Sequence, residues 1–189
     1  MKISLGAKTL AHPTPTWVVG TYDHDGKPNV ATVAWAGICC SQPPCVAVSL
    51  RMATYSYGKI VERKAFTVNV PTDAHVNEAD YFGLVSGRDV DKLAAAGLTP
   101  VASQLVDAPF VDQFPLVLEC RLLHTLEIGL HTQFVGEILD VKASESVLDD
   151  KGRIDVQKIR PFIFAPGDRT YHGLGPFLAK AFSVGKGEK

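Results

Sequence analysis

The stretch Lys27-Pro-Asn-Val-Ala-Thr-Val-Ala-Trp35 opens the most informative segment of the chain, which continues through Pro44-Cys-Val-Ala-Val-Ser-Leu-Arg51 and Phe66-Thr-Val-Asn-Val70. All three runs are rich in valine and other strand-forming residues, which predicts β-strands. Between the last two runs, Thr54 or Ser56 can cap a short helix. We therefore expect an apolar wall of strands that ends in a polar, anion-binding loop. Such a wall suits a flat aromatic ligand with a phosphate tail.

The rest of the chain continues the pattern of strands joined by turns. Strands are predicted at residues 17–22, 29–35, 45–50, 66–70, 116–128, 132–141 and 162–164, helices at about 54–63, 72–84, 90–96 and 176–182, and loops at 37–44 and 167–175. Because turns rather than long helices connect successive strands, the pattern favours a mainly β fold with helical insertions, built as an antiparallel barrel. A single domain is expected over residues 1–189.

Composition excludes several classes of protein. The net charge of −1 leaves no basic field for nucleic acid. No apolar run approaches the roughly 18 residues that span a membrane, and the start of the chain lacks the apolar core of a secretory signal. The four cysteines are expected to be reduced thiols, which favours a cytoplasmic location.

Several catalytic signatures are missing. No Gly-x-Gly-x-x-Gly motif, phosphate-binding Walker loop or Gly-x-Ser-x-Gly elbow is found, and none of the six histidines has the spacing of metal ligands. We therefore expect neither a Rossmann dinucleotide site, nor a serine nucleophile, nor a bound metal.

A candidate anion site lies where the strand at 45–50 gives way to the helix. Ser49, Arg51, Thr54 and Ser56 fall in one turn at a helix N-terminus, where free N–H groups and hydroxyls can bind phosphate. A capped helix with a solvated arginine explains the same spacing equally well. Arg88 or Lys92 could bring a second cation, although residues of this kind more often belong to a charged helix face.

Three further residues are open to two interpretations. Trp35 ends a strand of small residues and could close over a flat ring, or could belong to the core. Asn69 is a polar residue in an apolar strand, so its amide binds either the sheet or a ligand. His131, at the start of a strand, is either a surface residue or a participant in catalysis.

Taken in order, these segments resemble the flavin-reductase-like family of FMN-binding split barrels. The matching stretches are Asn29–Trp35, Pro44–Ser49, Ser56-Tyr57 with Ile60, Phe66–Val70, Ser86-Gly87 through Lys92, and Gly129-Leu-His131 before Phe134-Val-Gly-Glu-Ile138. Within the family, the chain looks most similar to the electron-carrying members. Many relatives have Gly-Asp-His where this chain has Gly129-Leu130-His131, which changes the charge beside that histidine.

The resemblance implies a Greek-key split barrel that forms a homodimer and binds FMN. It places the flavin ring against the strand that ends at Trp35, the phosphate near Arg51, and the candidate catalytic residue His131 beside the ring. The loop with Phe164 and Tyr171 would cover the other side of the ring. The implied cofactor-binding residues are Asn29, Thr32, Val33, Ala34, Trp35, Ser49, Leu50, Arg51, Thr54, Ser56, Asn69, Lys92, His131, Phe164 and Tyr171.

Three functions follow from the residues and the resemblance. The first is a redox protein that passes electrons through bound FMN from a partner protein to an acceptor. The second is an NAD(P)H:flavin oxidoreductase. The third is a module that binds haem or another ligand without redox chemistry. Because the cofactor would carry the redox chemistry, the protein would set its position and potential.

Overall fold

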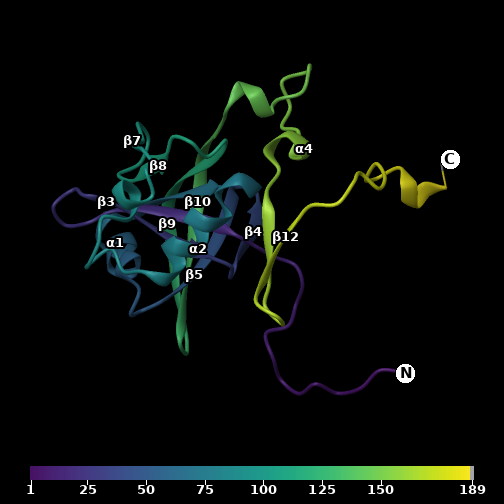
Figure 1. The fold of residues 1–189 in the computed structure, drawn as a ribbon, viewed down its shortest axis with the longest axis horizontal. Helices are drawn as coiled ribbons and strands as arrows, with labels where there is room; N and C mark the ends of the chain where they lie inside the picture. Colours follow the sequence, from purple (N-terminus) through teal and green to yellow (C-terminus); the bar gives the residue numbers. More distant parts are fainter. Residues whose placement is uncertain (188–189) are drawn as a thin grey trace.

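The computed structural model describes residues 1–187 and is mainly β (Figure 1). Its strands are β1 (Thr14–Pro15), β2 (Trp17–Tyr22), β3 (Pro28–Val33), β4 (Ala36–Ser41), β5 (Pro44–Arg51), β6 (Ala65–Val70), β7 (Pro100–Ala102), β8 (Pro109–Val111), β9 (Leu116–Ile128), β10 (His131–Ala143), β11 (Phe162–Ala165) and β12 (Thr170–Gly173). Its α-helices are α1 (Tyr55–Arg63), α2 (Val76–Leu84), α3 (Lys92–Ala95) and α4 (Val156–Ile159). Three 3₁₀ turns lie at Asp73–His75, Glu145–Val147 and Val184–Lys186.

Seven strands form one antiparallel sheet in the order β3-β2-β6-β9-β10-β5-β4. β3 and β4 lie at opposite ends of this order, yet only Ala34 and Trp35 separate them in the chain. The sheet must therefore curl until its two ends meet at this bend. There, the Ser49 amide on β5 donates a hydrogen bond of 2.8 Å to the carbonyl of Trp35. The expected antiparallel barrel thus closes beside residues that were expected to bind a ligand.

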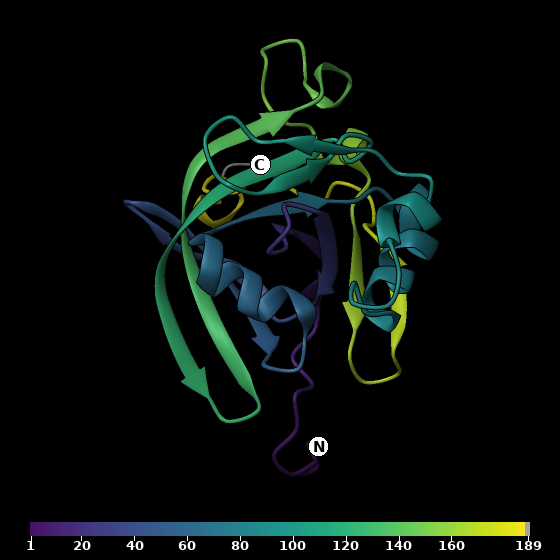
Figure 2. The ribbon, with the colours of Figure 1, turned by 90° about the vertical axis from the view of Figure 1, so that its left-hand side faces the viewer.

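The core fills the curled sheet and is covered by α1. The buried residues that share this cluster are Val19, Val33, Val46, Val48, Leu50, Ile60, Phe66, Val68, Leu118, Cys120 and Phe134. Figure 2 shows α1 against the curved sheet, and its Ile60 belongs to this cluster. Phe66 needs the glycine at position 136, because a Cβ there would lie 2.5 Å from Cζ of its ring. A second cluster, with Phe82 and Leu93, packs α2 and α3 against β2 and β3.

Three sequence-based expectations of local structure were wrong. Residues 37–44, expected as a loop, include most of β4, because pairing with β5 overrides their glycine and proline content. The expected loop at 167–175 contains β12, which pairs with β11. Residues 176–182 form no helix. Phe177 and Leu178 there are exposed, and so short a helix is unstable in water without packing.

No helix within residues 1–187 is long and apolar enough to cross a lipid bilayer. Three segments extend away from the barrel, and the first is the chain before β1 (Figure 1). The hairpin of β9 and β10 continues beyond the body of the sheet, and the chain after β12 extends outward (Figure 1).

Candidate functional site

A cavity of about 490 Å³ opens beside the bend that closes the barrel. Its volume lies within the range of about 300–1,000 Å³ that is usual for ligand pockets. Five parts of the chain form its walls. They are the end of β3 with the bend, the end of β5 with the start of α1, the end of α2, one residue of α3 and one residue of β10. The lining residues are Ala31–Trp35, Ser49–Arg51, Ala53–Ser56, Phe82–Ser86, Lys92 and His131.

One end of the cavity is formed by the N-terminus of α1. Thr54 is the N-cap residue in an extended conformation, but its hydroxyl makes no capping bond and the first turn has no acidic residue. The amide donors and positive potential of this helix end are therefore available to an anion. Arg88 lies outside the lining, but its guanidinium packs over the ring of Tyr55 at 5.4 Å and donates to the Ala53 carbonyl at 3.3 Å, and both of these residues line the cavity.

Lys92 brings a buried positive charge to the same cavity. Its side chain comes from the first residue of α3, and its Nζ donates 2.8 Å hydrogen bonds to the carbonyls of Val30 and Phe82. Within residues 1–187 no carboxylate forms an ion pair with it, and burial lowers the pKa of Lys92 from 10.5 to about 8. An ammonium has three donors. One N–H therefore remains available for a ligand, and an anion in the cavity would stabilise the charge.

The end of β5 brings Arg51 together with His131 of β10. The two residues are directly opposite in the antiparallel pair of β5 and β10, so their side chains share one face of the sheet. Both line the cavity. Arg51 is exposed and His131 is half-buried, which leaves the histidine beside the mouth of the cavity.

Asn29 does not line the cavity, but it holds Ser56, which does. Its Nδ2 donates to the Oγ of the buried Ser56 at 2.9 Å, which ties β3 to the first turn of α1. Its Oδ1 is buried and has no partner within the described chain. Gly87 approaches this oxygen so closely that a Cβ at position 87 would lie 2.0 Å from it. The loop that follows α2 therefore packs directly on Asn29.

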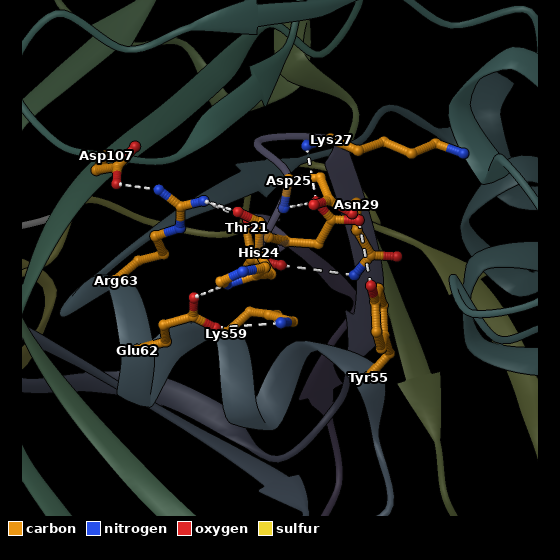
Figure 3. A network of polar contacts seen from close by, with 11 residues as sticks. Thr21, His24, Asp25, Lys27, Asn29, Tyr55, Lys59, Glu62, Arg63 and Asp107 are labelled. Carbon is orange, nitrogen blue, oxygen red and sulfur yellow. Dashed lines mark hydrogen bonds and ion pairs between the residues drawn. The ribbon is translucent and has the colours of Figure 1, made fainter.

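A polar network holds α1 against the β2–β3 turn (Figure 3). Arg63 donates to Asp107 at 2.9 Å and to the carbonyls of Asp23 and His24 in this turn. At the other end of the helix, the Tyr55 hydroxyl donates to Asp23 Oδ2 at 3.1 Å. Tyr55 also lines the cavity, so the network fixes one wall of the site.

Most of the residues that the sequence suggested as ligand contacts line the cavity, and four do not. Asn29 is hydrogen-bonded to Ser56 and is not itself part of the lining. Asn69 donates to the Val18 carbonyl at 3.0 Å and accepts from the Val111 amide at 2.9 Å, so its amide binds the scaffold. Phe164 and Tyr171 lie on β11 and β12, outside the lining. The Tyr171 hydroxyl donates to Asp80 on α2 at 2.7 Å, and burial with this bond raises its pKa.

Sequence reasoning missed part of the lining. Ala31, Ala53, Tyr55 and the α2 end at Phe82–Ser86 also face the cavity. The sequence predicts a helix that ends at about residue 84, but nothing in the local sequence shows that α2 lies over β3. That arrangement depends on tertiary packing, including the hydrogen bond from Thr32 Oγ1 to the Ala79 carbonyl.

Comparison with known proteins assigns the chain to a class. Residues 9–171 match the family described as flavin reductase like domain, and the chain belongs to this family. Its fold is the split barrel of flavin-reductase-like proteins, and the family is one of flavin-binding domains.

Among solved structures, the chain is similar to flavoredoxin of Desulfovibrio vulgaris (Miyazaki F), with 58% identity, a TM-score of 0.94, and coverage of 98% of this chain and 100% of that one. It is also similar to flavoredoxin from Methanosarcina acetivorans, with 30% identity, a TM-score of 0.89, and coverage of 99% and 97%. A protein of Archaeoglobus fulgidus is 34% identical over 129 residues, which are 68% of this chain and 73% of the relative.

Proposed function

We propose that the cavity binds FMN and that the protein is an electron carrier of the flavoredoxin type. The flavin-reductase-like family and the similarity to two flavoredoxins support this proposal. Bound FMN would supply the redox chemistry, which no side chain of the site provides.

The observation that carries the proposal is the buried charge of Lys92 in the same cavity as the uncapped N-terminus of α1. A lysine whose pKa is lowered to about 8 by burial is costly to the protein unless an anion binds there. The donors at Thr54–Ser56 and the guanidinium of Arg51 face the same cavity. Together they suit a dianionic phosphate, which distinguishes FMN from riboflavin.

The remaining walls suit the flavin ring. Ala31, Ala34 and Gly83 leave room for a flat group, and Trp35 supplies an aromatic surface at the end of the strand. His131 lies directly opposite Arg51 on the cavity wall. We assign it to the region of the ring because the resemblance to the flavin-reductase-like family puts a histidine there. There it would orient the ring or the electron donor.

A second candidate function is NAD(P)H:flavin oxidoreductase activity. The observation that favours it is the position of His131 at the mouth of the cavity, where an incoming nicotinamide could reach the ring. Leu130 replaces the carboxylate that many relatives have beside this histidine, and for that reason we favour the carrier function.

Anaerobic reduction of the FMN-loaded protein distinguishes the two functions. Flavin absorbance near the visible maximum is followed after mixing with NADH, with NADPH, or with a reduced iron–sulfur protein. We expect the reduced iron–sulfur protein to bleach the flavin quickly and both nicotinamides to bleach it slowly. Fast bleaching by NADH or NADPH would support the reductase. A protein that binds no FMN, or that binds haem with a Soret band, would refute both.

We further propose that the protein works as a cytoplasmic homodimer. Leu126, Ile128 and Leu130 on the projecting β9–β10 hairpin are each more than half exposed, and a second copy would cover them. Sedimentation equilibrium should give twice the chain mass of 20.4 kDa. A monomer at micromolar concentration would contradict this assignment.

A further inference from the structure

Three of the four cysteines lie in the β4–β5 hairpin. Cys39 and Cys40 are exposed on β4, whereas Cys45 on β5 is buried. Cys40 and Cys45 are directly opposite in the antiparallel register, next to the pair of Ser41 and Pro44. Cys39 falls in the irregularity between Ile38 and Cys40 and has no register partner on β5. The hairpin therefore pairs one accessible thiol with one sheltered thiol.

This arrangement suits a disulfide. Directly opposite residues of an antiparallel pair point to the same face, with Cβ atoms about 4.5–5.5 Å apart. Their Cα separation of about 4.5–5.5 Å falls within the range that disulfides accept. The Cβ atoms need to approach by only about 1 Å. β4 is the edge strand of the sheet, so it can shift without breaking a second ladder.

The surroundings differ for the two thiols. Burial, and then the neighbouring thiol of Cys40, raise the pKa of Cys45. Glu137, directly opposite Cys45 on β10, adds a smaller effect of the same sign. Cys45 therefore stays protonated near neutral pH, while Cys40 is open to solvent. Of the two paired thiols, an oxidant therefore meets Cys40 before Cys45.

The hairpin thiols are separate from the flavin cavity. Cys45 shares a face of β5 with Ser49, but four residues of strand place them about 13 Å apart. None of the three cysteines lines the cavity. No group of histidine, cysteine and acidic residues within residues 1–187 could hold a metal ion, so the cluster is not a metal site.

We propose that Cys40 and Cys45 form a peroxide-reactive dithiol that closes to a disulfide across the β4–β5 hairpin. The Cys40 thiol gives up its proton and its sulfur attacks hydrogen peroxide; the O–O bond breaks, Cys40 becomes a sulfenic acid, and the leaving hydroxide takes up that proton and departs as water. The Cys45 sulfur then attacks the Cys40 sulfur, its proton passes to the leaving oxygen, and a second water departs. Two thiols are oxidised by two electrons, and one peroxide is reduced to two waters.

Thiol mapping of the full-length protein tests the proposal. Protein treated with a small excess of hydrogen peroxide is denatured, alkylated with iodoacetamide without reduction, and analysed by intact mass and by fragmentation of the peptide containing residues 28–51. We expect two of the four thiols to be lost and one bridge to link Cys40 to Cys45 within a single chain. Dithiothreitol should restore all four thiols.

Matched serine variants make the assignment specific. Cys39→Ser should still form the bridge, whereas Cys40→Ser and Cys45→Ser should not. A bridge that uses Cys39, a bridge between two chains, or a sulfinic acid at Cys40 without any bridge would overturn the proposal. The thiol count needs no flavin. The disulfide proposal can therefore be wrong while the protein still binds FMN, and the protein can form the disulfide without binding FMN.

Discussion

At the residue scale, the ammonium of Lys92 explains why the cavity should select a phosphorylated ligand. Replacement with methionine, Lys92→Met, removes the charge but keeps most of the side-chain volume. Because a hydrogen bond to a charged group is worth about 1.5–3 kcal/mol, FMN affinity should fall at least about tenfold. Fluorescence titration measures the change, and riboflavin binding serves as the control because it has no phosphate. Equal losses for both ligands would show that the cavity has collapsed.

The same lysine predicts how FMN binding depends on pH. With its pKa lowered to about 8, Lys92 is mostly charged at pH 7 and mostly neutral at pH 9 in the ligand-free protein. The charged form binds phosphate, so affinity for FMN should decrease as the pH rises through 8. The decrease approaches about tenfold between pH 7 and pH 9. Titrations of the wild type and of Lys92→Met at both values test this, and a variant with the same pH dependence would point to another group.

Gly87 allows the loop after α2 to pack directly on Asn29. In Gly87→Ala the new Cβ would lie 2.0 Å from Asn29 Oδ1 and 2.9 Å from Tyr55 Cδ1, so the loop must move. Such a clash costs about 1–3 kcal/mol, and we expect lower stability together with weaker FMN binding. Gly58→Ala is the matched control.

A Cβ at position 58, within α1, meets nothing within 4 Å. The control should be stabilised by about 0.5–1 kcal/mol, because alanine favours helix over glycine. Urea unfolding of the two variants measures the difference. Similar stability of both would mean that the loop does not pack on Asn29 as described.

At the element scale, Arg63 holds the C-terminal end of α1 on the β2–β3 turn (Figure 3). Arg63→Met removes its bonds to the carbonyls of this turn and to Asp107. We expect a loss of about 1–3 kcal/mol in unfolding free energy, because the turn and α1 lose several hydrogen bonds to one charged group.

The control for this element is Arg153→Met. Arg153 also binds a carboxylate, that of Asp149, but its side chain is 71% exposed. Surface pairs of this kind contribute about 0–1 kcal/mol, so thermal unfolding should barely change. A larger loss for Arg153→Met than for Arg63→Met would contradict the description of the network.

The elements differ in how well the sequence predicts them. β2, β5 and β6 are evident from their valine-rich runs, and α1 from the hydroxyl residues before it. β4 was not evident, because Ala36–Ser41 becomes a strand only through its pairing with β5. The tail at 176–182 shows the opposite case, since its helical pattern has no surface to pack on.

At the scale of the whole molecule, the closed barrel brings distant parts of the chain to one cavity. The anion-binding residues near Arg51 were predictable, because they are close in sequence. The wall formed by Phe82–Ser86 was not, since its place follows from the packing of α2 on β3. The residue type of Asn69 did not show whether it binds a ligand or the protein. In the structure its buried amide is hydrogen-bonded to the backbone of Val18 and Val111.

The central claim is that this cavity binds FMN through its phosphate. Its most direct test is calorimetric titration of flavin-free protein with FMN and with riboflavin at pH 7. We predict one FMN per chain and at least about tenfold weaker binding of riboflavin, since one charge-assisted hydrogen bond is worth about 1.5–3 kcal/mol. Equal affinity for the two flavins, or no binding of FMN, would contradict the account.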